Sequence, residues 1–185
     1  PITPKVEHCR IGDVAGTVAI IERLARERHR NVYMPWAVVR ADLPRGKKAS
    51  EADLIAVLGV VIDDDPDRGK SATQLPLPSD YVLETSSDPA QNRQLFYVFD
   101  QPLTVAMAKP IAEALTDGIG ADHGGKDLGH VWRVPGTPNW PNRKKVHEHG
   151  RPREPVPVRI LKWWDGSRTA PERLLDAIAS VDPGN

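Results

Sequence analysis

An apolar run that leads directly into three carboxylates, Val60–Asp65, constrains the fold more than any other stretch. A short continuous apolar run predicts a buried strand, so Asp63, Asp64 and Asp65 would lie where that strand reaches the edge of its sheet. Three neighbouring negative charges repel one another unless a cation is present, and a hard divalent cation takes oxygen ligands of this kind. The other interpretation is a solvated acidic turn, and this stretch alone does not decide between the two.

Alternation along the strand divides the three carboxylates. Residues two apart share a face, so Asp63 and Asp65 can converge on one cation site while Asp64 faces away. The pair is separated by about 6.5 Å along the strand, which suits two metal ions about 4 Å apart. Asp64 is then an internal control, whose substitution by Ala or Asn is expected to matter far less. The apolar run is continuous, however, so its phase alone does not exclude Asp64 as the ligand.

Composition limits the possible classes of protein. The 185 residues are enough for one domain with an ample core. The formal net charge of zero gives no global sign of nucleic-acid binding, so such binding needs a local patch. Cys9 is the only cysteine, which excludes an internal disulfide and predicts a reducing, cytoplasmic location. No apolar run is long enough to span a membrane. Because the chain begins at Pro1 without Met, we expect a piece excised from a longer protein.

The periodicity predicts an α+β domain with a mostly antiparallel sheet and flanking helices. It divides into an N-terminal α/β part (1–56), a metal-binding core (57–165) and a C-terminal helix (166–185). A first helix is predicted from Val14, capped by Asp13, to about Arg30, with one apolar stripe expected to be buried. The remaining predicted elements are strands at 32–39, 81–85, 94–99, 128–134 and 156–164, and helices at 103–119 and 171–181.

A second group of charged residues lies between 127 and 145. Asp127 stands at the edge of the predicted strand 128–134, and Arg133, six residues on, shares its face. Arg143, Lys144 and Lys145 follow on a predicted loop. An acid and a base placed in this way can serve a metal and a phosphate at one site, and loop cations can hold a triphosphate or a nucleic-acid backbone. A salt-bridged strand with a proline-rich turn is the alternative, which the spacing alone slightly favours.

Together, the two groups resemble the archaeo-eukaryotic primase superfamily. The resemblance rests on the hydrophobic-Asp-x-Asp strand, on the later isolated Asp127, and on the string Trp-Arg-Val-Pro-Gly-Thr-Pro-Asn at 132–139 with a following Lys. Within the superfamily, the chain is most similar to the primase domains of RepB-type plasmid replication proteins and of phage or prophage primase-polymerases. The resemblance covers roughly 57–145, about half of the chain, and implies an RRM-like catalytic core.

The resemblance also implies roles for single residues. Asp63, Asp65 and Asp127 would be the catalytic carboxylates that hold two Mg²⁺ or Mn²⁺ ions. The superfamily has a Ser-x-His motif at the start of a strand, where this chain has no His and carries Gln94, so the ligand of the triphosphate stays open among Ser86, Arg93 and Gln94. The other residues implied at the nucleotide are His130, Arg133, Asn139 and Lys144, and those implied at nucleic acid are Arg143, Lys145 and Trp140.

The implied activity is that of a DNA primase or DNA-directed polymerase. It would transfer nucleotides from nucleoside triphosphates onto a primer on single-stranded DNA, with two cations activating the 3′ hydroxyl and stabilising the pyrophosphate. A helicase or a helical primase domain in the full-length protein is the expected partner, as in plasmid or phage replication. The alternatives are a non-catalytic replication module that binds nucleic acid and a metal-dependent nuclease. A zinc site is not expected, because four suitably spaced ligands are missing.

Overall fold

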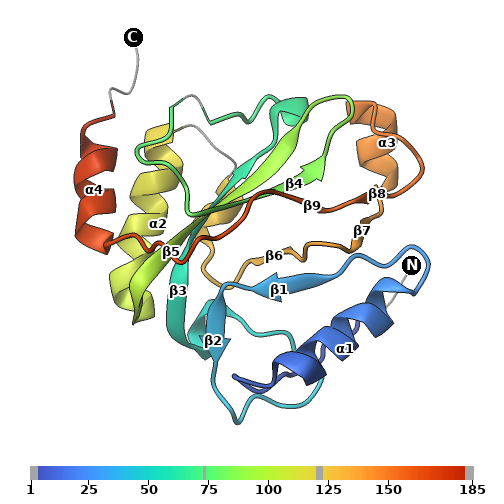
Figure 1. Cartoon of the computed structure of the whole chain (residues 1–185), viewed down its shortest axis with the longest axis horizontal. Helices are drawn as coiled ribbons and strands as arrows, with labels where there is room; N and C mark the ends of the chain where they lie inside the picture. Colours follow the sequence, from blue (N-terminus) through green and yellow to red (C-terminus); the bar gives the residue numbers. More distant parts are fainter. Residues whose placement is uncertain (1–3, 73, 120–122, 182–185) are drawn as a thin grey trace.

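A curved antiparallel sheet forms the centre of the molecule (Figure 1). The computed structural model describes residues 4–72, 74–119 and 123–181, so the predicted C-terminal part is described only as far as residue 181. Within these residues the main sheet has five strands in the order β2-β3-β5-β4-β9, all antiparallel to their neighbours. The strands are β2 (Ala37–Val39), β3 (Leu54–Asp64), β4 (Tyr81–Ser86), β5 (Asn92–Leu103) and β9 (Arg159–Lys162). The predicted α+β class with a mostly antiparallel sheet is confirmed.

Two helices cover one face of this sheet, α2 (Val105–Ile119) and α4 (Pro171–Ala179) (Figure 1). Pro110 lies inside α2 and does not end the helix. The main hydrophobic core fills the space between sheet and helices, and its removal from water is the chief favourable term in folding. Its most buried members include Val60, Ile62, Leu95, Tyr97, Ala108, Leu115 and Leu174.

Short strands and a second hydrophobic cluster lie on the opposite face. β1 (Tyr33–Pro35) pairs with β6 (Val131–Arg133), and β7 (Pro138–Asn139) pairs with β8 (Val156–Pro157). The predicted strand at 32–39 is thus two strands, which break at Trp36. Trp132 on β6 packs into the cluster with Val61, Leu83, Phe96 and Val158.

The pleat of β3 distributes its side chains between the two faces. Val60 and Ile62 pack toward the helices, whereas Val61 packs toward β6. Gly59 lies at an irregularity in the pairing with β5, where a Cβ atom would be only 2.0 Å from the carbonyl oxygen of Tyr97. Only glycine therefore fits there, and the alternation that runs from Gly59 continues into the carboxylates at the end of the strand.

The first helix differs from its prediction. α1 (Val14–Ala25) begins at the Asp13 cap, whose carboxylate accepts a hydrogen bond from Gly16, but it ends five residues early. Its apolar stripe is at most half-buried: the exposed fraction is 71% for Val14 and 46% for Val18, whereas Ile21 and Ala25 are partly buried. The helix lies beside the body of the molecule (Figure 1). Arg23 on this helix forms a surface ion pair with Glu7 at 2.6 Å. The helical spacing of apolar residues therefore did not indicate full burial here.

Another helix was not predicted at all. Residues 143–145, expected on a loop, form the first turn of α3 (Arg143–His149). Asn142 caps the start by accepting a hydrogen bond from the backbone of Lys145, and Gly150 ends the helix with φ of 66°. The described chain also has single turns at η1 (Glu51–Asp53), η2 (Pro66–Arg68) and η3 (His123–Lys126). No helix in the described ranges has the length and apolar character that crossing a bilayer requires.

Candidate active site

A polar pocket of about 140 Å³ opens where β3, β4 and β5 meet the short strands and α3. Side chains from segments that are far apart in the sequence line it, which makes it a product of the tertiary fold. The lining residues are Tyr33, Asp63, Asp65, Thr85, Gln94, His130, Val131, Arg133, Asn139 and Lys145.

Asp63 and Asp65 both reach this pocket, one from the end of β3 and the other from the residue that caps η2. Asp63 shares the face of Val61, because side chains alternate along the strand. Gln94 lies opposite Asp63 on β5, and its Nε2 donates to Asp63 Oδ1 at 3.3 Å. The Oε1 of the same amide accepts from the backbone N–H of Arg133 at 3.0 Å. Gln94 therefore links the acidic strand to β6.

Asp64 and Arg93 lie on the other face of the sheet and pair with each other. Arg93 donates to Asp64 Oδ2 from Nε (2.9 Å) and Nη2 (2.6 Å), while Ser71 Oγ and the backbone of Ala72 donate to Oδ1. This corrects two expectations. Arg93 does not line the polar pocket, because its guanidinium pairs with Asp64. Asp64 is no neutral control, because it is fully buried and its substitution breaks an ion pair that the fold uses.

Two cations face the carboxylates, Arg133 from β6 and Lys145 from α3. Burial is the main cause that lowers the pKa of each, and the neighbouring Arg151 lowers both further. The guanidinium of Arg133 lies over the ring of Tyr33, 4.4 Å from its centroid. Its Nη1 atom is buried and makes no hydrogen bond to any described residue. Because an unsatisfied buried donor is costly, this arrangement favours an anionic ligand.

The structure does not bring Asp127 to the pocket, contrary to its expected role as the third carboxylate. Its side chain is exposed and accepts a hydrogen bond from the backbone of Gly129 at 2.9 Å. Gly129 packs tightly against Ser50 and Glu51, which precede β3. Asp127 therefore lies toward the beginning of that strand, whereas Asp63 and Asp65 lie at its end.

The other predicted residues divide into two groups. His130 and Asn139 line the pocket, and Ser86 lines a small adjoining recess. Of the neighbouring lysines the structure places Lys145 in the pocket, whereas Lys144 is exposed and its Nζ is 3.6 Å from Glu148. The helix of α3 turns consecutive residues in different directions, which a loop prediction did not anticipate.

The residues expected at nucleic acid, apart from Lys145, lie outside the pocket. Arg143 is exposed on the first turn of α3. Trp140 is half-buried, and its ring lies 4.4 Å from that of His29, centroid to centroid. Its backbone exchanges two hydrogen bonds with the side chain of Asn31. Trp140 is therefore packed against the segment that follows α1 and is not on an open loop.

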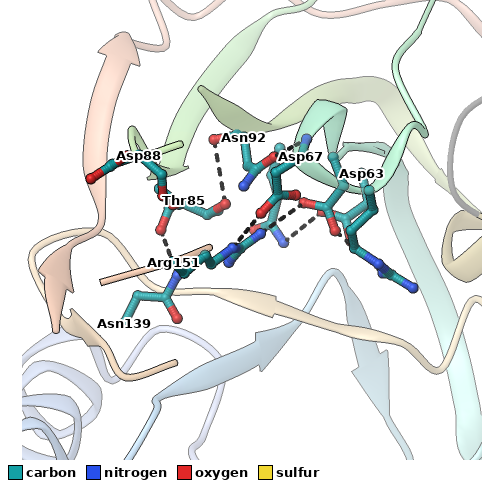
Figure 2. Close-up of polar contacts among 11 residues, drawn as sticks. Asp63, Asp67, Thr85, Asp88, Asn92, Asn139 and Arg151 are labelled. Carbon is teal, nitrogen blue, oxygen red and sulfur yellow. Dashed lines mark hydrogen bonds and ion pairs between the residues drawn. The ribbon is translucent and has the colours of Figure 1, made fainter. Parts of the chain in front are cut away.

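Tyr33, Thr85 and Arg151 were missed by the sequence reasoning. Figure 2 shows Arg151 reaching Asp67, and Asn139 reaching Thr85, on the same side of the sheet. The glycine before Arg151 was a readable signal, since Gly commonly ends a helix and would have placed Arg151 at the end of α3. Tyr33 carried no comparable signal, because its position depends on the pairing of β1 with β6.

The carboxylate oxygens that line the pocket are suitable ligands for a hard divalent cation. Asp63 and Asp65 supply carboxylate oxygens, which are the ligands that Mg²⁺ and Mn²⁺ prefer. Among the residues that the structure describes, no group of three His, Cys, Asp or Glu side chains converges. A cation held by these two residues would complete its coordination with water and with phosphate oxygens, as is common for Mg²⁺.

Comparison with solved structures identifies the fold. The chain is similar to the AEP domain of the primase-polymerase from cyanophage S-2L, with a TM-score of 0.58 and 15% sequence identity over 87% of this chain and 76% of that one. The fold is that of an archaeo-eukaryotic primase-polymerase domain. No protein-family profile and no curated protein matches the sequence.

Proposed function

We propose that this domain carries out template-directed nucleotidyl transfer and synthesises or extends primers on single-stranded DNA. The observation that carries the proposal is the pocket in which Asp63 and Asp65 face Arg133 and Lys145. Carboxylates for a metal beside cations for a triphosphate are the two components that this reaction requires. The similarity of the fold to a phage primase-polymerase domain supports the same class of enzyme.

In the proposed reaction the 3′ hydroxyl of a primer attacks the α-phosphate of a nucleoside triphosphate, and pyrophosphate leaves. Two Mg²⁺ or Mn²⁺ ions, when bound, would lower the pKa of the hydroxyl and offset the charge of the leaving group. Asp63 and Asp65 hold the cations, and Gln94 fixes Asp63 by its hydrogen bond. Arg133 and Lys145 bind the triphosphate, and Asn139 and His130 complete the nucleotide site.

The exposed face of α3 is the proposed contact with the template. Arg143 and Lys144 are exposed there, one turn or less from the pocket-lining Lys145, so they can contact DNA phosphates without entering the pocket. A helical primase domain or a helicase is the proposed partner, in a plasmid or phage replication system in the cytoplasm.

The direct test is primer extension with template, Mn²⁺ and nucleotides. Asp63→Asn and Asp65→Asn keep the size of the side chain and remove its charge, so we expect each to lower incorporation by at least about a hundredfold. Asp127→Asn is the matched control: from its position outside the pocket, we expect incorporation within about threefold of the unaltered protein. Full activity in the Asp63 and Asp65 variants would contradict the proposal.

A second function, DNA binding without synthesis, is favoured by one observation. Only two of the three expected carboxylates reach the pocket, and no third acidic, His or Cys ligand joins them in the described part of the chain. A pure binding module would retain single-stranded DNA in EDTA, with strong salt dependence, and would incorporate no nucleotide. Degradation of labelled DNA without added nucleotide would instead indicate a nuclease.

A further inference from the structure

Four carboxylates lie within five residues at the end of β3 and in the turn that follows it, and arginine side chains approach this group. Arg93 pairs with Asp64. Asp65 has the Nη1 of Arg68 at 3.4 Å from its Oδ2. Arg151, from a different part of the chain, contacts Asp67 through Nε and has its Nη2 at 3.7 Å from Asp65 Oδ1. The two arginines therefore flank both oxygens of Asp65.

Arg151 is fixed in this position. Its side chain is 4% exposed and that of Asp67 is fully buried, so neither can turn out into water. The chain enters Arg151 directly from the glycine that ends α3, and the backbone N–H of Arg151 donates to the carbonyl of Lys145. Its Nη2 atom makes no hydrogen bond to any described residue, although it lies close to Asp65. The buried guanidinium of Arg151 is thus held by Asp67 and lies close to Asp65.

We propose that Arg151 is a built-in counter-cation of the metal site, which Asp67 holds against Asp65 and which weakens the binding of a divalent cation in the absence of nucleotide. This inference rests on the proposed function, because it requires Asp65 to be a metal ligand. The physical reason is Coulombic: a fixed positive charge about 4 Å from a carboxylate in a partly buried site opposes a second cation there. Asp67 moderates that opposition by neutralising part of the charge of Arg151.

If Arg151 acts through its charge, substitutions of Arg151 and of Asp67 should change Mn²⁺ affinity in opposite directions. Arg151→Met removes the competing charge, so Mn²⁺ binding should become tighter by on the order of tenfold. Asp67→Asn leaves Arg151 in place without its neutralising carboxylate, so Mn²⁺ binding should become weaker. If Arg151 only supported the structure, both substitutions would disturb Asp65 and both would weaken binding.

The experiment is calorimetric titration of the nucleotide-free protein with Mn²⁺, together with thermal melts with and without the ion. We expect saturating Mn²⁺ to raise the Tm of Arg151→Met by about 3–6 °C more than that of the unaltered protein, which corresponds to tenfold tighter binding. Arg40→Met is the matched control, because Arg40 Nε pairs at 2.9 Å with the buried carboxylate of Asp53, which does not line the pocket. It should lower Tm without changing the increment produced by Mn²⁺.

Equal Mn²⁺ affinity in Arg151→Met and the unaltered protein, or weaker binding in both Arg151→Met and Asp67→Asn, would overturn the inference. Should Arg151→Met fail to fold, Arg151→Gln removes the same charge, can still donate to Asp67, and carries the same expectation of tighter binding. Primer extension separates this inference from the proposed function. A protein that extends primers but shows no affinity change retains the function and refutes the counter-cation, whereas the reverse result refutes only synthesis.

Discussion

Gln94 shows how one side chain can connect two halves of a site. Its amide donates to Asp63 and accepts from the backbone of Arg133, so it fixes a carboxylate and the strand that carries a cation. A neutral histidine also has one donor and one acceptor, but it becomes a double donor when protonated. The amide of Gln94 keeps one donor and one acceptor at every pH. It can therefore make both hydrogen bonds at the position where the superfamily that the sequence resembles has His.

Loss of Gln94 should therefore impair the reaction more than the fold. For Gln94→Leu we expect nucleotide incorporation to fall by about 10–100-fold, the range found when a group that orients a metal ligand is removed. The measurement is primer extension with varied Mn²⁺ and nucleotide concentrations. Gln91→Leu is the control, since Gln91 on the same hairpin donates to Glu84 outside the pocket. Equal losses in the two variants would refute the assigned role.

Lys145 should make nucleotide binding sensitive to alkaline pH. Burial and the nearby Arg151 lower the pKa of Lys145, so its positive charge is lost at a lower pH than in an exposed lysine. Nucleotide KM should then rise as pH increases through this lowered pKa. The effect on the fold has the opposite sign, because between the folded and unfolded pKa values the unfolded chain binds more protons and stability increases with pH.

The test is the pH profile of KM for the unaltered protein and for Lys145→Arg. Arginine stays charged over the whole range, so the alkaline rise in KM should be absent from this variant. A rise of the same size in both proteins would assign the titration to another group.

At the scale of elements, α3 is the part of the site that sequence reasoning missed and had the means to find. Asn142 and Gly150 are ordinary residues for the start and the end of a helix and have the correct separation, but residues 143–145 were interpreted as a loop. The consequence was an exchange of roles between Lys144 and Lys145. By contrast, local sequence was enough to place Asp63 and Asp65 on one face of β3 and Asp64 on the other, although the continuous apolar run left open which face carries the site.

The glycine that ends α3 gives a test at this scale. Gly150 has φ of 66°, and an added Cβ would meet only Pro89 at an ordinary contact distance of 3.9 Å. The cost of Gly150→Ala is therefore that of the backbone conformation, about 1 kcal/mol of unfolding free energy. Since Lys145 and Arg151 lie on either side of this turn, nucleotide KM should rise as well. Urea denaturation and steady-state kinetics measure the two effects, and an unchanged KM would show that α3 tolerates the shift.

At the scale of the whole molecule, the sheet separates stability from the candidate chemistry. One face packs against α2 and α4, and the other carries the pocket. The hairpin of β4 and β5 and the terminal helix were predictable because their patterns are local. The exposure of α1 and the distance of Asp127 from the pocket were not, because both depend on how distant segments pack. An apolar stripe and a spacing of six residues carry no information on that packing.

This separation predicts that core damage leaves the pocket intact. Leu115 on α2 is 1% exposed and belongs to the helix-side core, so Leu115→Ala should lower the free energy of unfolding by about 2–5 kcal/mol. At a temperature where the variant is still folded, nucleotide KM should stay within about twofold. Urea denaturation and primer extension test the two halves of this prediction, and a large rise in KM would show that the two faces are coupled.

The alternation along β3 also determines which changes in length the strand can accept. Between the fixed Gly59 and the carboxylates, one inserted residue would turn Asp63 and Asp65 under the helices and bring Asp64 to the pocket. Two inserted residues would restore the original order. Insertions and deletions in this segment should therefore survive selection only when they add or remove an even number of residues. Evolution would then preserve whether the number of residues between Gly59 and the carboxylates is odd or even, more than the number itself.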